Sequence, residues 1–121
     1  MDLLMPRRIH TVRQLAELAF RRIGAEPRVI AEIEAIPTLS LAVRAGLGST
    51  ILPWSAASVI LEGDAGVAAR RITGPTIPVK VSLCTSQQFP LSEPALAVRD
   101  ILSELAHGYA SAHGDRGVRR A

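Results

Sequence analysis

The chain has 121 residues, of which 48% are apolar and 21% are charged, and its formal net charge is +3. These values are typical of one globular domain with a core of its own, and they exclude a largely disordered chain. The single cysteine, Cys84, excludes an internal disulfide and a zinc site made of cysteines alone.

The basic residues are almost all arginines, and they are scattered along the chain without aromatic residues among them. So small a net charge favours solvated surface over a nucleic-acid interface. No stretch holds the roughly 18 consecutive apolar residues of a membrane-spanning helix, and the first ten residues do not resemble a secretory signal. We therefore expect a cytoplasmic protein without membrane contact.

The start of the chain predicts a strand followed by a helix. The short apolar run over residues 3–5 indicates a buried strand. Residues 12–23 predict a helix that Gly24 ends. Its apolar residues at helical spacing are Val12, Leu15, Ala16, Ala19 and Ile23. Thr11 followed by Gln14 has the spacing of a capping box, so Thr11 is the predicted helix cap.

The next stretch predicts a strand, a helix and a third strand. Residues 28–34 alternate partly between two faces and indicate a strand. Pro37 is favourable in the first turn of the following helix, which Gly46 would end. Gly48 would then turn the chain into a strand over residues 49–52, since helix-to-strand connections of about two to six residues are usual in α/β units.

Ser55 is the predicted cap of a short helix that ends at Gly63. The apolar runs over residues 67–72 and 79–85 predict two further strands. Residues 73–78 lie between them and hold two prolines and a glycine, which favours a crossing between two layers or lobes over a tight hairpin.

The last predicted helix begins after Ser92, with Pro94 in its first turn. Its apolar stripe consists of Val98, Ile101, Leu102, Leu105 and Tyr109. Residues 113–121 lack periodicity and are expected to form a disordered tail. The alternation of strands and helices predicts an α/β fold with a mainly parallel sheet flanked by helices.

Ligands of open parallel α/β sheets bind beyond the carboxyl ends of the strands, where helix N-termini favour anions. This rule selects the loops of residues 6–11, 35–38 and 53–55. The polar and aromatic residues that they bring to one edge are Arg7, Arg8, His10, Thr11, Thr38, Trp54 and Ser55. A small anionic molecule is the predicted ligand. The alternative is that Thr11 and Ser55 are only helix caps and that Trp54 is only a packing residue.

Catalysis has little support, and no cofactor or metal is expected. The chain holds no nucleophile elbow, P-loop or zinc-protease motif. Glu32 and Glu34 fall on one face of their predicted strand. They could form a carboxylate pair, but a solvated strand face is the more common explanation. The sequence therefore does not favour an enzyme.

Two segments, "EIEAIPTLSLAVRAGLGSTILPWSAA" and "ARRITGPTIPVKVSLCTSQQFPLSEPALAVRDIL", resemble the effector-binding domain of LysR-type transcriptional regulators. The shared features are an acidic strand end, a helix that ends A-G-L-G, a strand that ends L-P, and P-L-S before the last helix. Here they are Glu32 with Glu34, residues 45–48, residues 52–53 and residues 90–92. The resemblance covers residues 3–109, and the segment "RRIH" is most similar to regulators of the nitrogen-assimilation type.

The resemblance implies a fold like that of periplasmic binding proteins, in which two α/β lobes close on an effector. Residues 1–75 would form the second lobe. Residues 76–112 would return to the first lobe as a strand and a helix, and residues 113–121 would be the tail. The first lobe would thus be incomplete, which would expose the apolar stripe of the last helix.

The family resemblance also implies which residues meet the effector and how the chain dimerises. The loop of residues 35–38 would contact the effector, and residues 7–11 would border the same cleft. The candidate effector-binding residues are Arg7, His10, Thr11, Ile36, Pro37, Thr38, Trp54, Ser55 and Thr76. Residues 12–23 and 28–33 would form a homodimer or a mixed dimer.

The function implied is the effector-binding and dimerisation region of a bacterial regulator that senses a small anionic metabolite. The resemblance also implies truncation, since no DNA-binding segment matches, so DNA would be bound only through a domain absent here. The alternative is a self-standing module that binds a small ligand or forms mixed dimers. A small α/β enzyme is the least favoured possibility.

Overall fold

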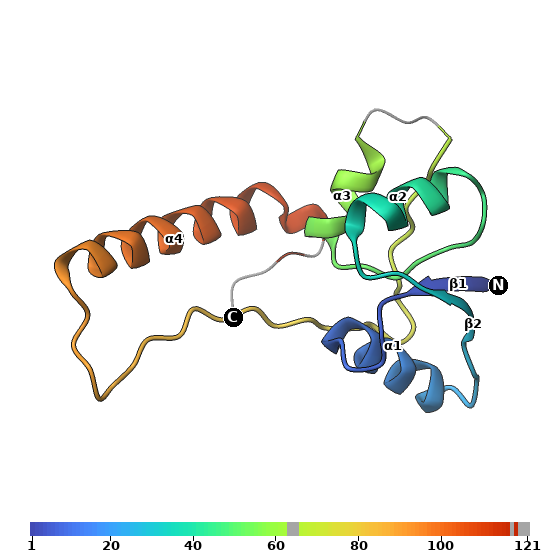
Figure 1. Cartoon of the computed structure of the whole chain (residues 1–121), viewed down its shortest axis with the longest axis horizontal. Helices are drawn as coiled ribbons and strands as arrows, with labels where there is room; N and C mark the ends of the chain where they lie inside the picture. The colour runs from blue at the N-terminus through green and yellow to red at the C-terminus, as the bar shows by residue number, and fades with distance from the viewer. Residues whose placement is uncertain (63–65, 117, 119–121) are drawn as a thin grey trace. The chain divides into compact units, whose positions relative to one another are not determined.

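The computed structural model of the chain describes residues 1–62, 66–116 and 118. The chain divides into two compact units, Met1–Val79 (unit 1) and Lys80–Ala121 (unit 2) (Figure 1). The assignment of residues 1–75 and 76–112 to two lobes stays a prediction.

Unit 1 follows the predicted order of strand, helix, strand and helix. Its elements are β1 (Asp2–Met5), α1 (Thr11–Arg22), β2 (Arg28–Glu32), α2 (Ile36–Arg44) and α3 (Trp54–Leu61). The two strands pair in parallel, with Leu3 opposite Val29 and Met5 opposite Glu32. The predicted α/β arrangement with parallel strands is therefore confirmed for this unit, although the second strand is two residues shorter than expected.

The third predicted strand, over residues 49–52, is wrong in its extent. Only Ser49 pairs with β1, in a parallel bridge. Its N–H donates to the Asp2 carbonyl oxygen at 2.9 Å, and its carbonyl oxygen accepts from the N–H of Leu4 at 2.8 Å. Pro53 has no N–H to donate, so the ladder cannot run far past this point. Since β1 lies between β2 and Ser49, three of its four residues are buried.

The core of unit 1 has two clusters, one on each face of the strands. The first cluster contains Leu4, Leu39, Ala42 and Ile60. The second cluster contains Leu3, Met5 and Ala16, with Phe20, Val29, Ile51 and Ile77 packed against it. Successive β1 residues therefore alternate between the clusters, as the pleat of a strand requires. Helix α1 covers one face of the sheet, and α2 and α3 cover the other (Figure 1).

The predicted stops of α1 and α2 are confirmed by the same backbone motif. Gly24 and Gly46 follow the two helices with φ of 66° and 72°, in the left-handed region that favours glycine. The N–H of each glycine donates three residues back, to Arg21 and Val43. The N–H of the next residue donates five residues back, which completes a Schellman motif.

Gly48 has a different role from these two glycines. A Cβ at this position would lie 3.0 Å from the Asp2 carbonyl oxygen and 3.1 Å from Leu4 Cγ. Glycine is needed here because the chain passes close to β1 on its way to the bridge at Ser49.

The predicted caps of α1 and α3 are wrong. His10, not Thr11, occupies the N-cap of α1, and its Nδ1 accepts the N–H of Val12 at 3.3 Å. A turn closed by the His10 N–H and the Arg7 carbonyl oxygen starts the helix one residue early. Ser55 lies inside α3, because Pro53 is at its N-cap. Helix α3 ends at Leu61, one residue before its predicted end, and the predicted stop at Gly63 lies outside the described residues.

Unit 2 contains the predicted last helix, α4 (Glu93–Ala112), followed by a 3-10 turn, η1 (Gly114–Arg116). Ser92 is at the N-cap of α4, but its side chain makes no capping bond. Residues 114–116 of the predicted tail form the turn η1, and residues 117 and 119–121 lie outside the described part. No described helix of the chain is long and apolar enough to cross a membrane.

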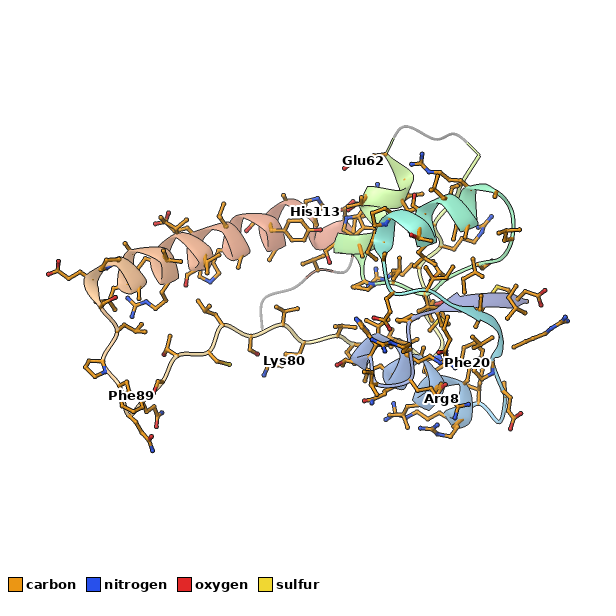
Figure 2. All side chains as sticks on the ribbon, viewed as in Figure 1. Arg8, Phe20, Glu62, Lys80, Phe89 and His113 are labelled. Carbon is orange, nitrogen blue, oxygen red and sulfur yellow. The ribbon has the colours of Figure 1, made fainter. Side chains whose placement is uncertain are left out.

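The strands predicted over residues 67–72 and 79–85 are wrong, since all of these residues are described and none is in a strand. Apolar side chains alone do not make a strand, because the backbone needs a neighbour for its ladder. Val81 is 90% exposed. The two phenylalanines also differ in burial: Phe20 packs against a core cluster, whereas Phe89 is exposed (Figure 2).

Candidate functional site

The carboxyl ends of the strands lie at one edge of unit 1. The N–H of Ile33, the first residue after β2, donates to the Met5 carbonyl oxygen at 2.9 Å. The segments that follow β1 and β2 therefore leave the sheet side by side. The segment at Ser49 runs parallel to them. The N-termini of α1, α2 and α3 follow these exits. We call residues 6–11, 33–38 and 53–55 the rim.

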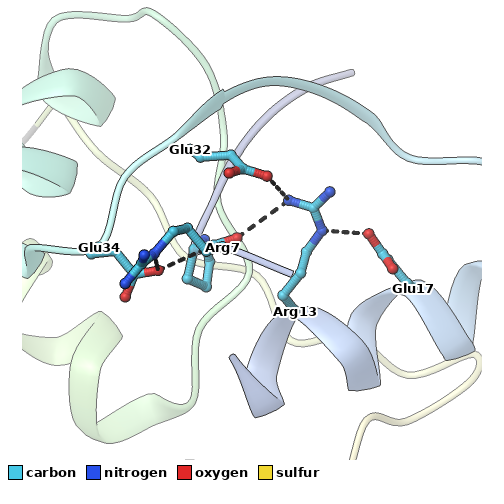
Figure 3. A network of polar contacts seen from close by, with 6 residues as sticks. Arg7, Arg13, Glu17, Glu32 and Glu34 are labelled. Atoms are coloured by element: carbon cyan, nitrogen blue, oxygen red, sulfur yellow. Dashed lines mark hydrogen bonds and ion pairs between the residues drawn. The ribbon is translucent and has the colours of Figure 1, made fainter. Parts of the chain in front are cut away.

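An exposed ion pair joins two loops of the rim. Oε1 of Glu34 accepts the backbone N–H of Arg7 at 2.8 Å and its Nε at 3.1 Å. The side chains are 62% and 43% exposed for Arg7 and Glu34. The backbone N–H of Arg7, and then its guanidinium, hold the pKa of Glu34 below its ordinary value. The pair links the loop before α1 to the connection before α2 (Figure 3).

Near this exposed pair lies a buried arginine, Arg13. Arg13 is 3% exposed, and its Nε donates to Glu17 Oε1 at 2.6 Å. Its Nη1 donates to the Pro6 carbonyl oxygen at 3.3 Å and lies 3.9 Å from Glu32 Oε1. A buried charge needs such partners to offset its lost hydration. The guanidinium thus ties α1 to the ends of β1 and β2 (Figure 3).

Sequence reasoning missed both of these contacts. The general expectation of solvated arginines fails for Arg13, although its spacing from Glu17 is that of a helical ion pair. Glu32 and Glu34 were considered as a carboxylate pair. Instead Glu32 faces Arg13 and Glu34 binds Arg7, so the two carboxylates have separate basic partners. No local signal identifies the Arg7 contact, because its partner is 27 residues away.

Seven of the nine candidate residues lie at the starts of the three helices. Thr11 opens α1 and follows its cap His10; Ile36, Pro37 and Thr38 are the first three residues of α2; and Trp54 with Ser55 opens α3. Arg7 precedes α1 and bonds Glu34. The side chain of Thr38 is exposed and so is that of Ser55.

Thr76 is not brought to the rim. It lines a hollow of about 70 Å³ together with Leu15, Leu18, Ala19, Arg22, Ile77 and Pro78. These residues place it beside the later turns of α1, because the adjacent Ile77 packs into the core cluster on that face. The hollow is small beside the roughly 300–1,000 Å³ of usual small-molecule sites.

The rim shows no metal-binding chemistry. Among the described residues no group of three or more His, Cys, Asp or Glu side chains could hold a metal ion. Glu17, Glu32 and Glu34 instead face arginines. The arrangement offers helix N-termini, Arg7 and His10 to a ligand, and these groups favour an anion over a cation.

Comparisons with known proteins identify the family of this chain. Residues 1–106 match the LysR substrate binding domain. The nitrogen assimilation regulatory protein nac of Klebsiella aerogenes is 40% identical over 107 residues, which cover 87% of this chain and 34% of that protein. The protein of the same name from Escherichia coli (strain K12) is 34% identical over 102 residues, which cover 84% of this chain and 33% of that protein.

The chain spans about a third of the length of these curated relatives. No solved structure matched the chain. The match to residues 1–106 covers the rim, both strands and most of α4. The chain therefore belongs to the family of LysR substrate-binding domains, the effector-binding region of LysR-type transcriptional regulators.

Proposed function

We propose that this region senses a small anionic metabolite at the rim. The observation that carries the proposal is the exit of parallel strands into three helix N-termini, beside Arg7 and His10. Free N–H groups and the positive end of the helix dipole stabilise an anion at such a place. The family is one of regulators, a non-enzymatic role, so the ligand is a signal rather than a substrate.

The ligand would act through its different affinity for two arrangements of the regulator. A ligand shifts a conformational equilibrium only by the difference in its binding free energy for the two states. We propose that the whole regulator is cytoplasmic and binds DNA. The residues that contact DNA would lie outside the matched residues 1–106. The relatives are named as regulators of nitrogen assimilation, so metabolites of nitrogen metabolism belong in the first ligand screen.

We also propose dimerisation through residues 12–23 and 28–33, which include nearly all of α1 and the whole of β2. The outer edge of β2 has no strand beside it among the described residues. Exposed apolar side chains on the same elements support this interface: Leu18, Ile23 and Ile30. Ile30→Lys should shift sedimentation of the chain from dimer to monomer, whereas Leu41→Lys, a change at an exposed residue of α2, should not.

A self-standing binding or mixed-dimer module is the second candidate. One observation favours it: both core clusters are made by residues of unit 1, so this unit holds its own buried core. Stable monomeric folding of the purified chain would favour this candidate over a dimeric regulator fragment.

The rim site is tested by a thermal-shift screen of small organic acids, followed by calorimetry on the best ligand. Thr38→Ala should weaken binding about 2- to 10-fold, since a lost hydrogen bond is worth roughly 0.5–1.5 kcal/mol. Thr76→Ala removes the same group away from the rim and should leave the affinity unchanged. Equal affinities for the unmodified chain, Thr38→Ala and Thr76→Ala would show that Thr38 does not contact the ligand.

A further inference from the structure

The Arg7–Glu34 pair occupies the part of the rim where an anion would bind. The proposed function requires a ligand oxygen near helix N-termini and Arg7. In the structure a carboxylate oxygen of Glu34 already lies beside Arg7, where the ligand oxygen would bind. Oε1 of Glu34 accepts both the backbone N–H and the Nε of Arg7.

We infer that Glu34 is an internal competitor of the effector, so that the ligand binds Arg7 only by displacing the Glu34 carboxylate. The inference rests on the proposed anion site. It makes Glu34 a residue that determines ligand specificity, a role that the strand-end rule by itself does not assign to it.

The exposure of the pair makes displacement feasible. Both side chains contact solvent, and exposed ion pairs of this kind change an equilibrium constant by only about 1.4- to 5-fold. Glu34 released from Arg7 can therefore be hydrated at little cost. Arg13 differs, because its guanidinium is buried and is held by Glu17 and the Pro6 carbonyl oxygen. Arg7 is thus the arginine of this region that can exchange one anion for another.

Competition with a tethered group also limits the ligand class. Glu34 reaches Arg7 from the same chain, so it does not lose translational freedom when it binds. A free monocarboxylate would replace one carboxylate by another and would lose that freedom. A ligand that displaces Glu34 at lower concentration than a monocarboxylate would therefore bring a second negative charge, which Arg8, His10 or the start of α2 can stabilise. The class is a small dianion, such as a dicarboxylate or a sulfate-like oxyanion.

The test is a titration of the full 121-residue chain with sodium sulfate, with sodium acetate as the monoanionic comparison. Ionic strength is held constant with sodium chloride, because salt screens exposed charges. The backbone amide of Arg7 is followed by NMR. Sulfate should shift this amide, and acetate should do so only at higher concentration.

Glu34→Gln removes the competing charge and should tighten sulfate binding about 1.4- to 5-fold, the range of an exposed ion pair. Glu26→Gln is the matched control. It makes the same charge change in the loop before β2, at the opposite end of the strand, and should leave the affinity unchanged. Equal tightening by both variants would mean a general charge effect and would overturn the inference.

A measurement on the unmodified chain avoids dependence on the folding of any variant. The side-chain carboxyl carbon of Glu34 should shift in step with the Arg7 amide as sulfate is added. A response of Arg7 without any response of Glu34 would refute displacement but leave the anion site intact. No response of the Arg7 amide to sulfate, in the unmodified chain or in Glu34→Gln, would reject both the competitor and the anion site.

Discussion

Unit 1 and unit 2 contain similar apolar patterns but have different degrees of burial. In unit 1 the apolar residues of β1, α1 and α2 lie in two clusters. In unit 2 the apolar stripe of α4 is regular, yet this helix has no buried residue. A periodic pattern therefore predicts where a helix forms. Whether its apolar face becomes core depends on a second element that supplies the other side.

The largest contrast between the units is expected from matched leucine substitutions. Leu39→Ala should lower the free energy of unfolding by about 2–5 kcal/mol, because Leu39 is 1% exposed and its removal leaves a cavity. Leu105→Ala, at a residue that is 64% exposed, should change it by less than about 0.5 kcal/mol. Urea unfolding measures both. A comparable loss for Leu105→Ala would show that the α4 stripe is covered in solution.

Arg7 and Arg13, both in unit 1, should show how a buried ion pair differs from an exposed one in its contribution to stability. Arg13→Ala should cost about 1.5–3 kcal/mol, since it leaves Glu17 and the Pro6 carbonyl oxygen without a charged donor. Arg7→Ala should cost at most about 1 kcal/mol because its pair with Glu34 is exposed. Chemical denaturation of the two variants decides the comparison. A larger loss for Arg7→Ala would contradict the burial difference.

Glycine-to-alanine substitutions should change the free energy of unfolding in opposite directions in the two units. Gly48→Ala should destabilise by about 1–3 kcal/mol, because the new Cβ would meet Asp2 and Leu4 of β1. Gly108→Ala lies inside α4, where the added Cβ would have nothing within 4 Å beyond its chain neighbours and the adjoining helix backbone. It should stabilise that helix by about 0.5–1 kcal/mol. Circular dichroism during thermal unfolding reports both changes, and a stabilising Gly48→Ala would show that the chain does not pass so close to β1.

The smallest effect is the pH dependence of the rim. The pKa of Glu34 is lower in the folded chain than its ordinary value of 4.5, so its contribution to stability is present above about pH 4.5. That contribution is lost as the pH falls through the folded pKa, when Glu34 is protonated. NMR titration of the Glu34 carboxyl carbon should give the lowered value, and Arg7→Gln should return it towards 4.5. An unchanged pKa of Glu34 in Arg7→Gln would exclude the guanidinium as a cause and leave the backbone N–H of residue 7, which the variant keeps.

The helices of this protein could be predicted well from their own residues. Gly24 and Gly46 end α1 and α2 as expected, because the left-handed conformation after a helix is a local preference of glycine. The caps were less predictable. Thr11 has the more favourable side chain, but the turn at residues 7–10 assigns the position to His10. Which residue occupies the N-cap depends on the conformation of the loop that precedes the helix.

The candidate site could be predicted in part. The strand-end rule selected Arg7, and the structure shows its two bonds to Glu34. The role of Arg13 could not be predicted, since the chain has 14 basic and 11 acidic residues and the sequence does not say which of them meet. Thr76 entered through the family resemblance, and the structure shows it beside α1 instead.

By itself the sequence determined the helices, the order of the first four elements of unit 1 and the family, because each depends on residues close together in the chain or on a pattern read along it. Only the tertiary structure decided which apolar runs became strands and which charges paired. A strand requires a neighbouring backbone, and an ion pair requires two side chains at one place. Residues 67–72 and 79–85 therefore have strand-like sequences without a strand, while Glu34 binds an arginine 27 residues away.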